Sequence, residues 1–259
     1  MAEFWKGLPA LRQPEHVLAM KGIHKGERVF MVGCGPSLKQ QEDILHHLNG
    51  ELTFTCNKMA NWAECPFRPT YHGITEPSHQ EHRGRHEIPQ WEPLGTVKLA
   101  LHWAPVFNDK PVQSNGWVWV SKAPDDIQVR RDGFWGLGDF LPPLPTGYTS
   151  PLTLAQLAAW MGCRDFIFLG CDMTDEGYVF NAGPARENIH PRTLIGIKEC
   201  FARARHDVEE AGGRMVDATP GGLMGYTGIL PYVEFADELG ISGERSRIQS
   251  GERSRIQSG

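Results

Sequence analysis

Several features that would place the chain in a special class are missing from its sequence. No apolar run approaches the length of a membrane-spanning helix, and the first residues lack the apolar core of a signal peptide. The cysteines form no CxxC pair and no dense framework, which favours reduced, buried thiols over disulfides. We therefore expect a reducing compartment: a cytoplasmic protein, or one peripheral to the inner face of a membrane.

An excess of positive charge is also missing. The 259 residues contain 26 Lys and Arg against 31 Asp and Glu, so the formal net charge is -5. Without a basic field we expect no nucleic-acid partner. Hydrophobic residues make up 40% and charged residues 22%, an ordinary globular composition in a chain long enough for one large α/β domain or two small ones. The composition is compatible with a monomer and with a homo-oligomer.

The two ends of the chain carry little that predicts a core. Residues 1–26 have scattered apolar residues punctuated by prolines, which indicates a lead-in with a short helix that covers the core. Residues 243–250 are followed by the same eight residues and a final glycine, and this polar stretch cannot bury a core. We predict a single domain over 27–240 and a disordered tail or an expression artefact over 241–259.

The densest signal is the stretch from residue 28 to residue 38. Residues 28–32 form a short apolar run that predicts a buried strand, and the tight turn Gly33-Cys34-Gly35 follows it. Pro36 and Ser37 suit the start of a helix. Strand, glycine turn and helix start together predict an anion site for a nucleotide phosphate, with exposed backbone N–H groups as donors. The alternative is a glycine turn that only connects two elements.

The third glycine of a dinucleotide-binding fingerprint is missing, because Leu38 stands where it would fall. NAD or FAD is therefore not the first expectation. Apolar residues over 38–48 follow a helical period that ends at an Asn-Gly pair, and 52–55 predicts a second strand. Strand, helix and strand in this order indicate a parallel sheet. Asn57 and Lys58 form a polar pair directly after the second strand, where open α/β sheets bind ligands. The alternative is that Asn57 only closes a turn.

Further elements follow along the chain. Residues 71–75, 97–101 and 166–169 predict strands, while 102–148 are irregular apart from 117–120 and suggest an insertion or lid over the ligand edge of the sheet. A helix is predicted after Thr149, with Ser150 as its N-cap and Gly162 as its stop. Helix 191–211 and strand 214–217 complete an α/β fold: a Rossmann-like, mostly parallel sheet with helices on both faces.

Candidate site residues lie in the loops after these strands. Asp172 is either catalytic or holds its own loop by hydrogen bonds, and Thr219, Pro220, Gly221 and Gly222 form a loop on the same edge. Three histidines over 79–86 lie among arginines and beside a glycine, which favours a solvated polar segment over a metal site.

The ordered motifs resemble those of the bacterial sialyltransferases of glycosyltransferase family forty-two. They are Gly-Cys-Gly-Pro-Ser-Leu over 33–38, Cys-Asn over 56–57, Thr-Ser over 149–150, Gly-Cys-Asp over 170–172 and Thr-Pro over 219–220. The likeness covers roughly 28–235 and is firmest over 149–174. Motility accessory factors and a pterin pyrophosphokinase group share the Gly-Pro-Ser-Leu turn.

The resemblance implies residue roles as well as a fold. It implies one domain with a lid-like insertion, which uses a CMP-sugar and a glycan acceptor and requires no metal cofactor. The glycine turn and Asn57 would hold the cytidine phosphate, Ser150 the donor sugar, and residues 219–222 the nucleoside. Tyr178 would support the leaving phosphate. His190 would be the general base that takes the proton of the acceptor hydroxyl.

Three departures from the family pattern are visible. Cys34 stands where asparagine is common, Thr174 where a second tyrosine is expected, and Glu76 where an asparagine lies near the donor carboxylate. A carboxylate at Glu76 would repel an acidic sugar, so either the donor is a different sugar or Glu76 holds a ribose hydroxyl or Mg²⁺. The alternatives are therefore a Mg-dependent enzyme of the pyrophosphokinase type and a non-catalytic nucleotide-binding protein on the same fold.

Overall fold

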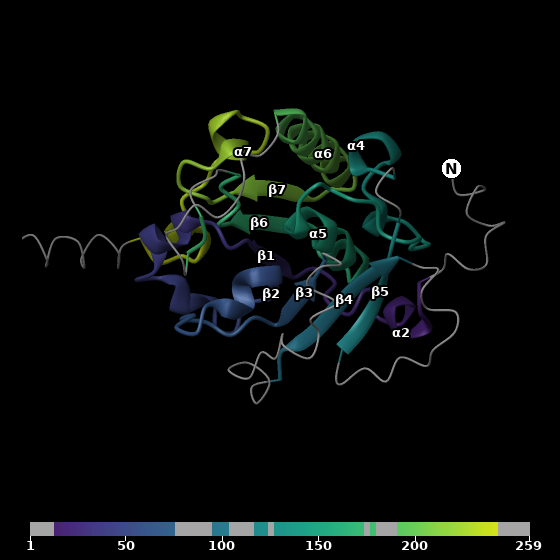
Figure 1. Ribbon diagram of the computed structural model, residues 1–259, viewed down its shortest axis with the longest axis horizontal. Helices are drawn as coiled ribbons and strands as arrows, with labels where there is room; N and C mark the ends of the chain where they lie inside the picture. The colour runs from purple at the N-terminus through teal and green to yellow at the C-terminus, as the bar shows by residue number, and fades with distance from the viewer. Residues whose placement is uncertain are drawn as a thin grey trace, which may run out of the picture.

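The structure, a computed structural model, describes residues 13–75, 95–103, 117–123, 127–173, 177–179 and 191–242. These parts contain one seven-stranded sheet in which every pair of neighbouring strands is parallel. Helices cover both of its faces (Figure 1). The α/β class, with a parallel sheet and helices on both sides, is thus confirmed.

The strand order is β5-β4-β3-β2-β1-β6-β7. The strands are β1 (Arg28–Val32), β2 (Thr53–Cys56), β3 (Tyr71–Ile74), β4 (Val97–Trp103), β5 (Trp117–Lys122), β6 (Asp165–Leu169) and β7 (Arg214–Asp217). The chain adds β2 to β5 on one side of β1 and then returns to add β6 and β7 on the other side. This reversal places a topological switch point between β1 and β6, where open α/β sheets bind ligands at the carboxyl ends of the strands.

One face of the sheet is covered by α5 (Ser150–Trp160) and α6 (Pro191–Glu210). The α5 helix is buried almost all round, as expected for a helix enclosed by other elements, and it contacts β1, β2 and β3. Shorter elements complete this layer: α2 (Glu15–Leu18), α4 (Val129–Asp132), η6 (Trp135–Leu137) and α7 (Leu223–Tyr226).

The N-cap of α5 differs from the expectation. Thr149, not Ser150, is the cap: its side chain accepts a hydrogen bond from the backbone N–H of Leu152 at 3.4 Å. Ser150 is the first helical residue, and its hydroxyl contacts other side chains instead. Thr and Ser are both good caps, so adjacent candidates cannot be separated by residue type alone.

The opposite face is covered by short helices. They are the 3-10 helices η1 (Pro36–Gln41), η2 (Leu45–Leu48) and η3 (Asn57–Asn61), together with α8 (Phe235–Glu238). The prediction of one helix over 38–48 is therefore wrong in type, although Leu38, Leu45 and Leu48 are fully buried as its pattern required. A spacing of three or four apolar residues fits successive 3-10 turns as well as an α-helix.

The predicted insertion over 102–148 contains a strand of the sheet. β4 extends to Trp103, and β5 pairs with it in parallel at the edge of the sheet. The described residues after 127 pack through α4 and η6 against α6 and α5. This stretch therefore contributes to the core, where Val129, Leu141 and Leu144 are fully buried.

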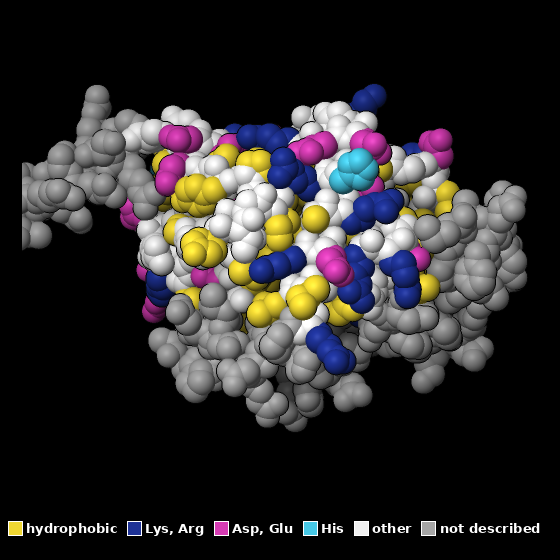
Figure 2. All heavy atoms as spheres, turned by 90° about the horizontal axis from the view of Figure 1, so that it is seen from above, with side chains coloured by type: hydrophobic (Ala, Val, Ile, Leu, Met, Phe, Trp, Pro, Cys, Tyr) yellow, Lys and Arg dark blue, Asp and Glu magenta, His cyan; other side chains and the backbone are white. Residues whose placement is uncertain are grey.

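The outer face of α6 carries charges of both signs, and Figure 2 shows them mixed over this side of the molecule. Arg203 pairs with Asp207, and Arg205 pairs with Glu209, each one helical turn apart. The buried face of the helix carries apolar residues at helical spacing: Ile197, Cys200, Phe201, Ala204 and Val208. No described helix is long and apolar enough to cross a membrane.

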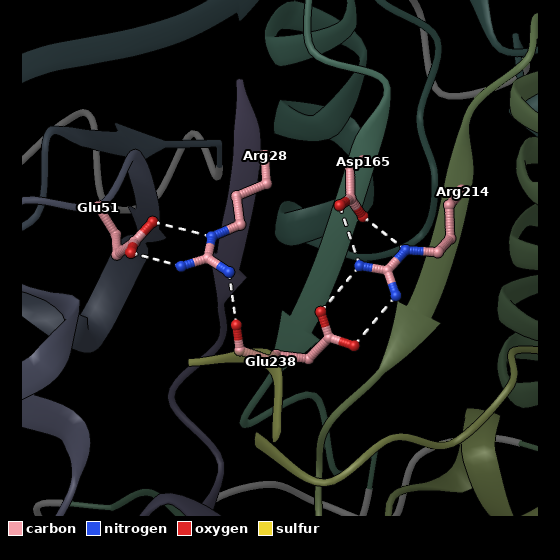
Figure 3. A network of polar contacts seen from close by, with 5 residues as sticks. All are labelled: Arg28, Glu51, Asp165, Arg214 and Glu238. Atoms are coloured by element: carbon pink, nitrogen blue, oxygen red, sulfur yellow. Dashed lines mark hydrogen bonds and ion pairs between the residues drawn. The ribbon is translucent and has the colours of Figure 1, made fainter. Parts of the chain in front are cut away.

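The amino ends of β1, β6 and β7 are joined by an ion-pair network (Figure 3). Arg28 at the start of β1 donates two hydrogen bonds to the Glu51 carboxylate, at 3.0 and 2.6 Å. Arg214 at the start of β7 bonds both Asp165 of β6 and Glu238 of α8 through paired contacts of 2.8–3.0 Å. Arg28 also donates to the carbonyl oxygen of Glu238 at 2.5 Å, so the network connects three strands and one helix at the edge opposite the switch point.

Candidate functional site

A cleft opens at the switch point, at the carboxyl ends of β1 and β6. Its empty volume is about 950 Å³, which includes solvent at its mouth. Four distant segments form most of its wall: 33–36 after β1, 56–58 after β2, 148–151 at the start of α5, and 170–173 after β6. Gly177, Tyr178 and two residues of α6, Thr193 and Ile197, complete the lining.

The glycine turn after β1 packs against the turn after β6. A Cβ atom on Gly33 would lie 2.4 Å from the carbonyl oxygen of Gly170, and one on Gly35 would lie 1.8 Å from Oδ2 of Asp172. Both glycines are thus required by the close approach of two turns. Their backbone N–H groups already donate to carbonyl oxygens, Gly33 to Leu169 at 2.8 Å and Gly35 to Gly170 at 2.9 Å.

These bonds differ from the expectation for the turn. We predicted exposed N–H groups as phosphate donors, but in this structure the N–H groups of Gly33 and Gly35 donate within the fold. The residues Gly33, Cys34, Gly35 and Pro36 still line the cleft, so the turn forms its wall.

Asp172 occupies the place at the start of η1 where an anion was expected. Its carboxylate accepts hydrogen bonds from the backbone N–H of Ser37 at 3.0 Å and from the Ser37 hydroxyl at 2.8 Å. Burial raises the pKa of the Asp172 carboxyl, and the two bonds from Ser37 act in the opposite direction. Asp172 lines the cleft, whereas Ser37 is buried behind it.

The loop over 219–222 supports the cleft from behind and does not line it. The Thr219 hydroxyl accepts a hydrogen bond from the backbone N–H of Cys171 at 3.2 Å, and Thr219 is fully buried. The backbone N–H of Thr219 donates to Asp217 at 2.9 Å. Pro220, Gly221 and Gly222, predicted to bind the nucleoside, are likewise absent from the described lining.

Asn57 and Ser150, 93 residues apart in the chain, meet at the cleft. The Asn57 amide donates to the Ser150 hydroxyl at 2.7 Å, while its carbonyl oxygen accepts the backbone N–H of Thr75 at 2.9 Å. The Thr75 and Ser150 hydroxyls also bond one another. This polar cluster ties the ends of β2 and β3 to the start of α5, beside the cleft.

Backbone strain is concentrated at the same place. Among the described residues, three that are not glycine have positive φ: Asn57 at 46°, Tyr148 at 59° and Met173 at 57°. All three line the cleft. Side chains other than glycine rarely adopt this conformation, and it persists where surrounding contacts over-determine it, commonly at functional sites. The strain is independent evidence for function at this cleft.

Two tyrosines give the cleft aromatic surface. Tyr148 is held by α4 and α6: Arg130 bonds its hydroxyl at 3.3 Å, and a Cβ on Gly196 would lie 2.9 Å from its ring. Tyr178 lies under the ammonium group of Lys58, with Nζ 4.7 Å from the ring centroid. The Tyr178 segment is fixed to the glycine turn, because the N–H of Val179 donates to the carbonyl of Cys34 at 3.0 Å.

The lining includes residues that the sequence did not single out, namely Tyr148, Met173, Thr193 and Ile197. Lys58, expected with Asn57 as a polar pair at the end of the second strand, also lines the cleft. Nothing in the sequence pairs Thr193 and Ile197 with the cleft except their spacing of one helical turn.

Cysteine side chains contribute to the wall as thiols. None of the six cysteines is in a disulfide, and Cys34, Cys56 and Cys171 line the cleft. Burial raises the pKa of the Cys171 thiol well above its ordinary value. A thiol that does not ionise is a poor nucleophile, so the cleft does not favour cysteine catalysis at this residue.

Some predicted positions lie outside the described residues. They are Glu76, Thr174, His190 and the three histidines over 79–86. Among the residues that the structure does describe, no group of three side chains has the arrangement of a metal site. The roles of His190 as base and of Glu76 as a ribose or Mg²⁺ ligand stay predictions.

Comparison with known proteins gives one structural similarity. No protein-family model matches the chain, and no curated protein matches it. Its fold is similar to that of the sialyltransferase CstII from Campylobacter jejuni, solved in complex with a substrate analogue, CMP-3FNeuAc. The two share 14% sequence identity with a TM-score of 0.46, and the match covers 77% of this chain and 84% of the other.

Proposed function

We propose that the protein is a nucleotide-sugar-dependent glycosyltransferase that uses a CMP-sugar donor and a surface-glycan acceptor. One observation carries the proposal: the motifs over 33–36, 56–57, 149–150 and 170–172 converge on one cleft at the switch point of the sheet. Spread along 140 residues of sequence, they have no local reason to meet, and this edge is where such sheets bind nucleotides.

The proposed reaction assigns separate tasks to the chain. The acceptor hydroxyl oxygen forms a bond to the anomeric carbon of the donor, and the bond from that carbon to the phosphate oxygen breaks. His190 takes the acceptor proton as this bond forms. Tyr178, at the wall of the cleft, stabilises the charge that develops on the leaving phosphate. Asn57 and Ser150 position the donor through their shared polar cluster.

A ligand screen tests the nucleotide. The melting temperature of the full chain is measured with CMP, CDP, UDP, GDP, ATP with Mg²⁺, and NAD. We expect cytidine nucleotides to stabilise the fold, by ~2.7 kcal/mol at about a hundred times the dissociation constant. Stabilisation by ATP with Mg²⁺ alone would replace this proposal with a pyrophosphokinase-type enzyme.

The transfer step is tested at His190, with a CMP-sugar donor and a panel of glycan acceptors. We expect His190→Ala to lower turnover by ~10²–10⁴ while CMP affinity is unchanged, because the base acts on the acceptor. His206→Ala is the matched control, since that ring is 63% exposed on the outer part of α6. Equal turnover in His190→Ala and in the wild type would remove His190 from the mechanism.

A second candidate is a nucleotide-binding protein without transferase activity. The engaged N–H groups of Gly33 and Gly35 favour it, because a phosphate would find fewer backbone donors than the turn predicts. CMP binding without donor hydrolysis or transfer on any acceptor would support this candidate over the enzyme.

A further inference from the structure

The phosphate of a nucleotide needs cationic or N–H donors, and the described cleft offers few of them. The N–H groups of Gly33 and Gly35 donate to backbone carbonyls, and that of Ser37 donates to Asp172. Asp172 occupies the start of η1. A phosphate bound there would be repelled by its carboxylate and would find the nearby N–H groups already donating hydrogen bonds within the chain. The charge of the phosphate must therefore be met elsewhere in the cleft.

Lys58 is the one cationic side chain among the described residues that line the cleft. It follows Asn57 at the start of η3 and is half-buried. No carboxylate of the described residues lies within ion-pair distance of its ammonium group. By contrast, Lys21 pairs with Asp139 and Lys39 pairs with Glu42. A partly desolvated ammonium that pairs with no acid of the described residues favours binding of an anion.

The Tyr178 ring fixes where this ammonium lies. Nζ of Lys58 is 4.7 Å from the ring centroid, within the range of a cation–π interaction. The segment that carries the ring is held at the glycine turn, because the backbone N–H of Val179 donates to the carbonyl oxygen of Cys34. The pair therefore joins the end of β2 to the end of β1 across the cleft, and a long flexible side chain is held at the wall.

We propose that Lys58 is the phosphate-binding residue of the cleft, and that its ammonium group replaces the backbone donors of the glycine turn. The ligand is the phosphate of a nucleotide or nucleotide sugar, so the inference rests on the proposed function. The sugar carboxylate of an acidic donor has similar chemistry, but Lys58 lies beside Tyr178 and the glycine turn, which form the predicted phosphate side of the cleft.

Calorimetry with matched ligands tests the assignment. Binding of CMP, cytidine, inorganic pyrophosphate and a free acidic sugar is measured for the wild type, Lys58→Met and Lys58→Arg. Met keeps the apolar stem and removes the charge. We expect Lys58→Met to weaken CMP about 10- to 100-fold, the size of a hydrogen bond to a charged group, and to leave cytidine unchanged. Lys58→Arg should restore most of the CMP affinity.

Lys39→Met is the matched control. Lys39 also lies over an aromatic ring, at 5.5 Å from the Trp62 centroid, and it is absent from the lining of the cleft. This variant removes the same unit of charge, so general electrostatics would weaken CMP equally in both. A local contact is supported if CMP affinity falls in Lys58→Met but not in Lys39→Met. Both variants should also have the melting temperature of the wild type.

The outcomes separate this inference from the proposed function. CMP binding that is equal in wild type and Lys58→Met overturns the role of Lys58 and leaves the function standing. Pyrophosphate binding that Lys58→Met abolishes, in a protein that binds no cytidine nucleotide, supports the anion site and overturns the CMP assignment. If Lys58→Met weakens binding of the acidic sugar but not of CMP, Lys58 binds the sugar carboxylate and its role in phosphate binding is overturned. A wild type that binds none of the four ligands overturns both.

Discussion

Asp172 shows how one carboxylate serves the fold at the edge of the cleft. It bonds the hydroxyl and the N–H of Ser37, and burial raises the pKa of its carboxyl. The backbone N–H at the start of η1 is thereby satisfied by the chain itself. Asp172 thus acts as an internal anion that links the loop after β6 to the helix after β1.

The raised pKa predicts a pH dependence of stability. A carboxyl with a raised pKa binds its proton more tightly in the folded chain, so its contribution is full below the ordinary value of 3.8 and falls as pH rises through the folded pKa. Asp172→Asn removes this titration. Relative to Asp172→Asn, the wild type should therefore lose free energy of unfolding as the pH rises above the ordinary carboxyl value of 3.8, as measured by urea denaturation.

Asp139→Asn is the control for this series, because its carboxylate is fully exposed. This variant removes an exposed carboxylate, so a pH dependence that it shares with Asp172→Asn would not come from the burial of Asp172. A wild type that gains stability over Asp172→Asn as pH rises would show that the bonds from Ser37 outweigh burial.

At the residue scale, the sequence predicts candidates better than it predicts their contacts. Asn57 and Ser150 were both expected at the ligand edge, and both line the cleft. Their mutual hydrogen bond joins positions 93 residues apart, which no local pattern encodes. Lys58 was expected with Asn57 as a polar pair at a strand end, but the sequence does not show that it is the one cationic side chain of the described lining.

Elements were predicted well where their pattern is periodic or strongly punctuated. The strands β1, β2, β6 and β7 lie within one or two residues of their expected positions, and α6 runs from Pro191 to Glu210 as its amphipathic pattern indicates. The segment over 38–48 was assigned the wrong type, because 3-10 turns bury the same positions as an α-helix. Tertiary contacts, such as the bond from Gln41 to the Ala218 carbonyl, decide between them.

The junction of β1 and β6 predicts a large effect from one methyl group. A Cβ on Gly33 would lie 2.4 Å from the backbone oxygen of Gly170. The clash is with backbone, which can shift only at a cost to the strands that it joins. We expect Gly33→Ala to lower the free energy of unfolding by about 1–3 kcal/mol, the usual cost of overpacking. Urea denaturation measures the change, and CMP affinity should fall with it because the wall of the cleft shifts.

Gly138→Ala serves as the comparison, because the nearest atom to its added Cβ would be 3.7 Å away. This variant should unfold within about 0.5 kcal/mol of the wild type, as most exposed substitutions do. Equal stability of Gly33→Ala and Gly138→Ala would mean that the two turns are not in close contact.

The whole molecule divides its tasks between the two edges of the sheet. Strained backbone, the polar cluster and the cleft gather at the carboxyl ends of the strands, while the ion-pair network of Arg28 and Arg214 lies at the amino ends. The sequence predicts a parallel sheet, from which two such edges follow. It does not predict the strand order, because the side of β1 on which β6 adds depends on packing across the whole sheet.

This division predicts that stability and binding can be separated at Arg214. Its guanidinium bonds Asp165 and Glu238 with paired contacts, so Arg214→Met removes four hydrogen bonds that connect β7, β6 and α8. The side chain is 45% exposed, so we expect a loss of only about 1 kcal/mol in the free energy of unfolding. Arg214→Lys should lose nearly as much, because an ammonium group cannot form both forked pairs.

The same variants should bind CMP as the wild type does, since the network lies at the edge opposite the cleft. Added salt should narrow the stability gap, because partly exposed ion pairs are screened. Calorimetry with CMP beside urea denaturation at low and high salt measures both properties on one sample. A fall in CMP affinity that accompanies the stability loss in Arg214→Met would show instead that the two edges are coupled through β6, which begins at Asp165 and ends at Leu169, next to the turn at Gly170.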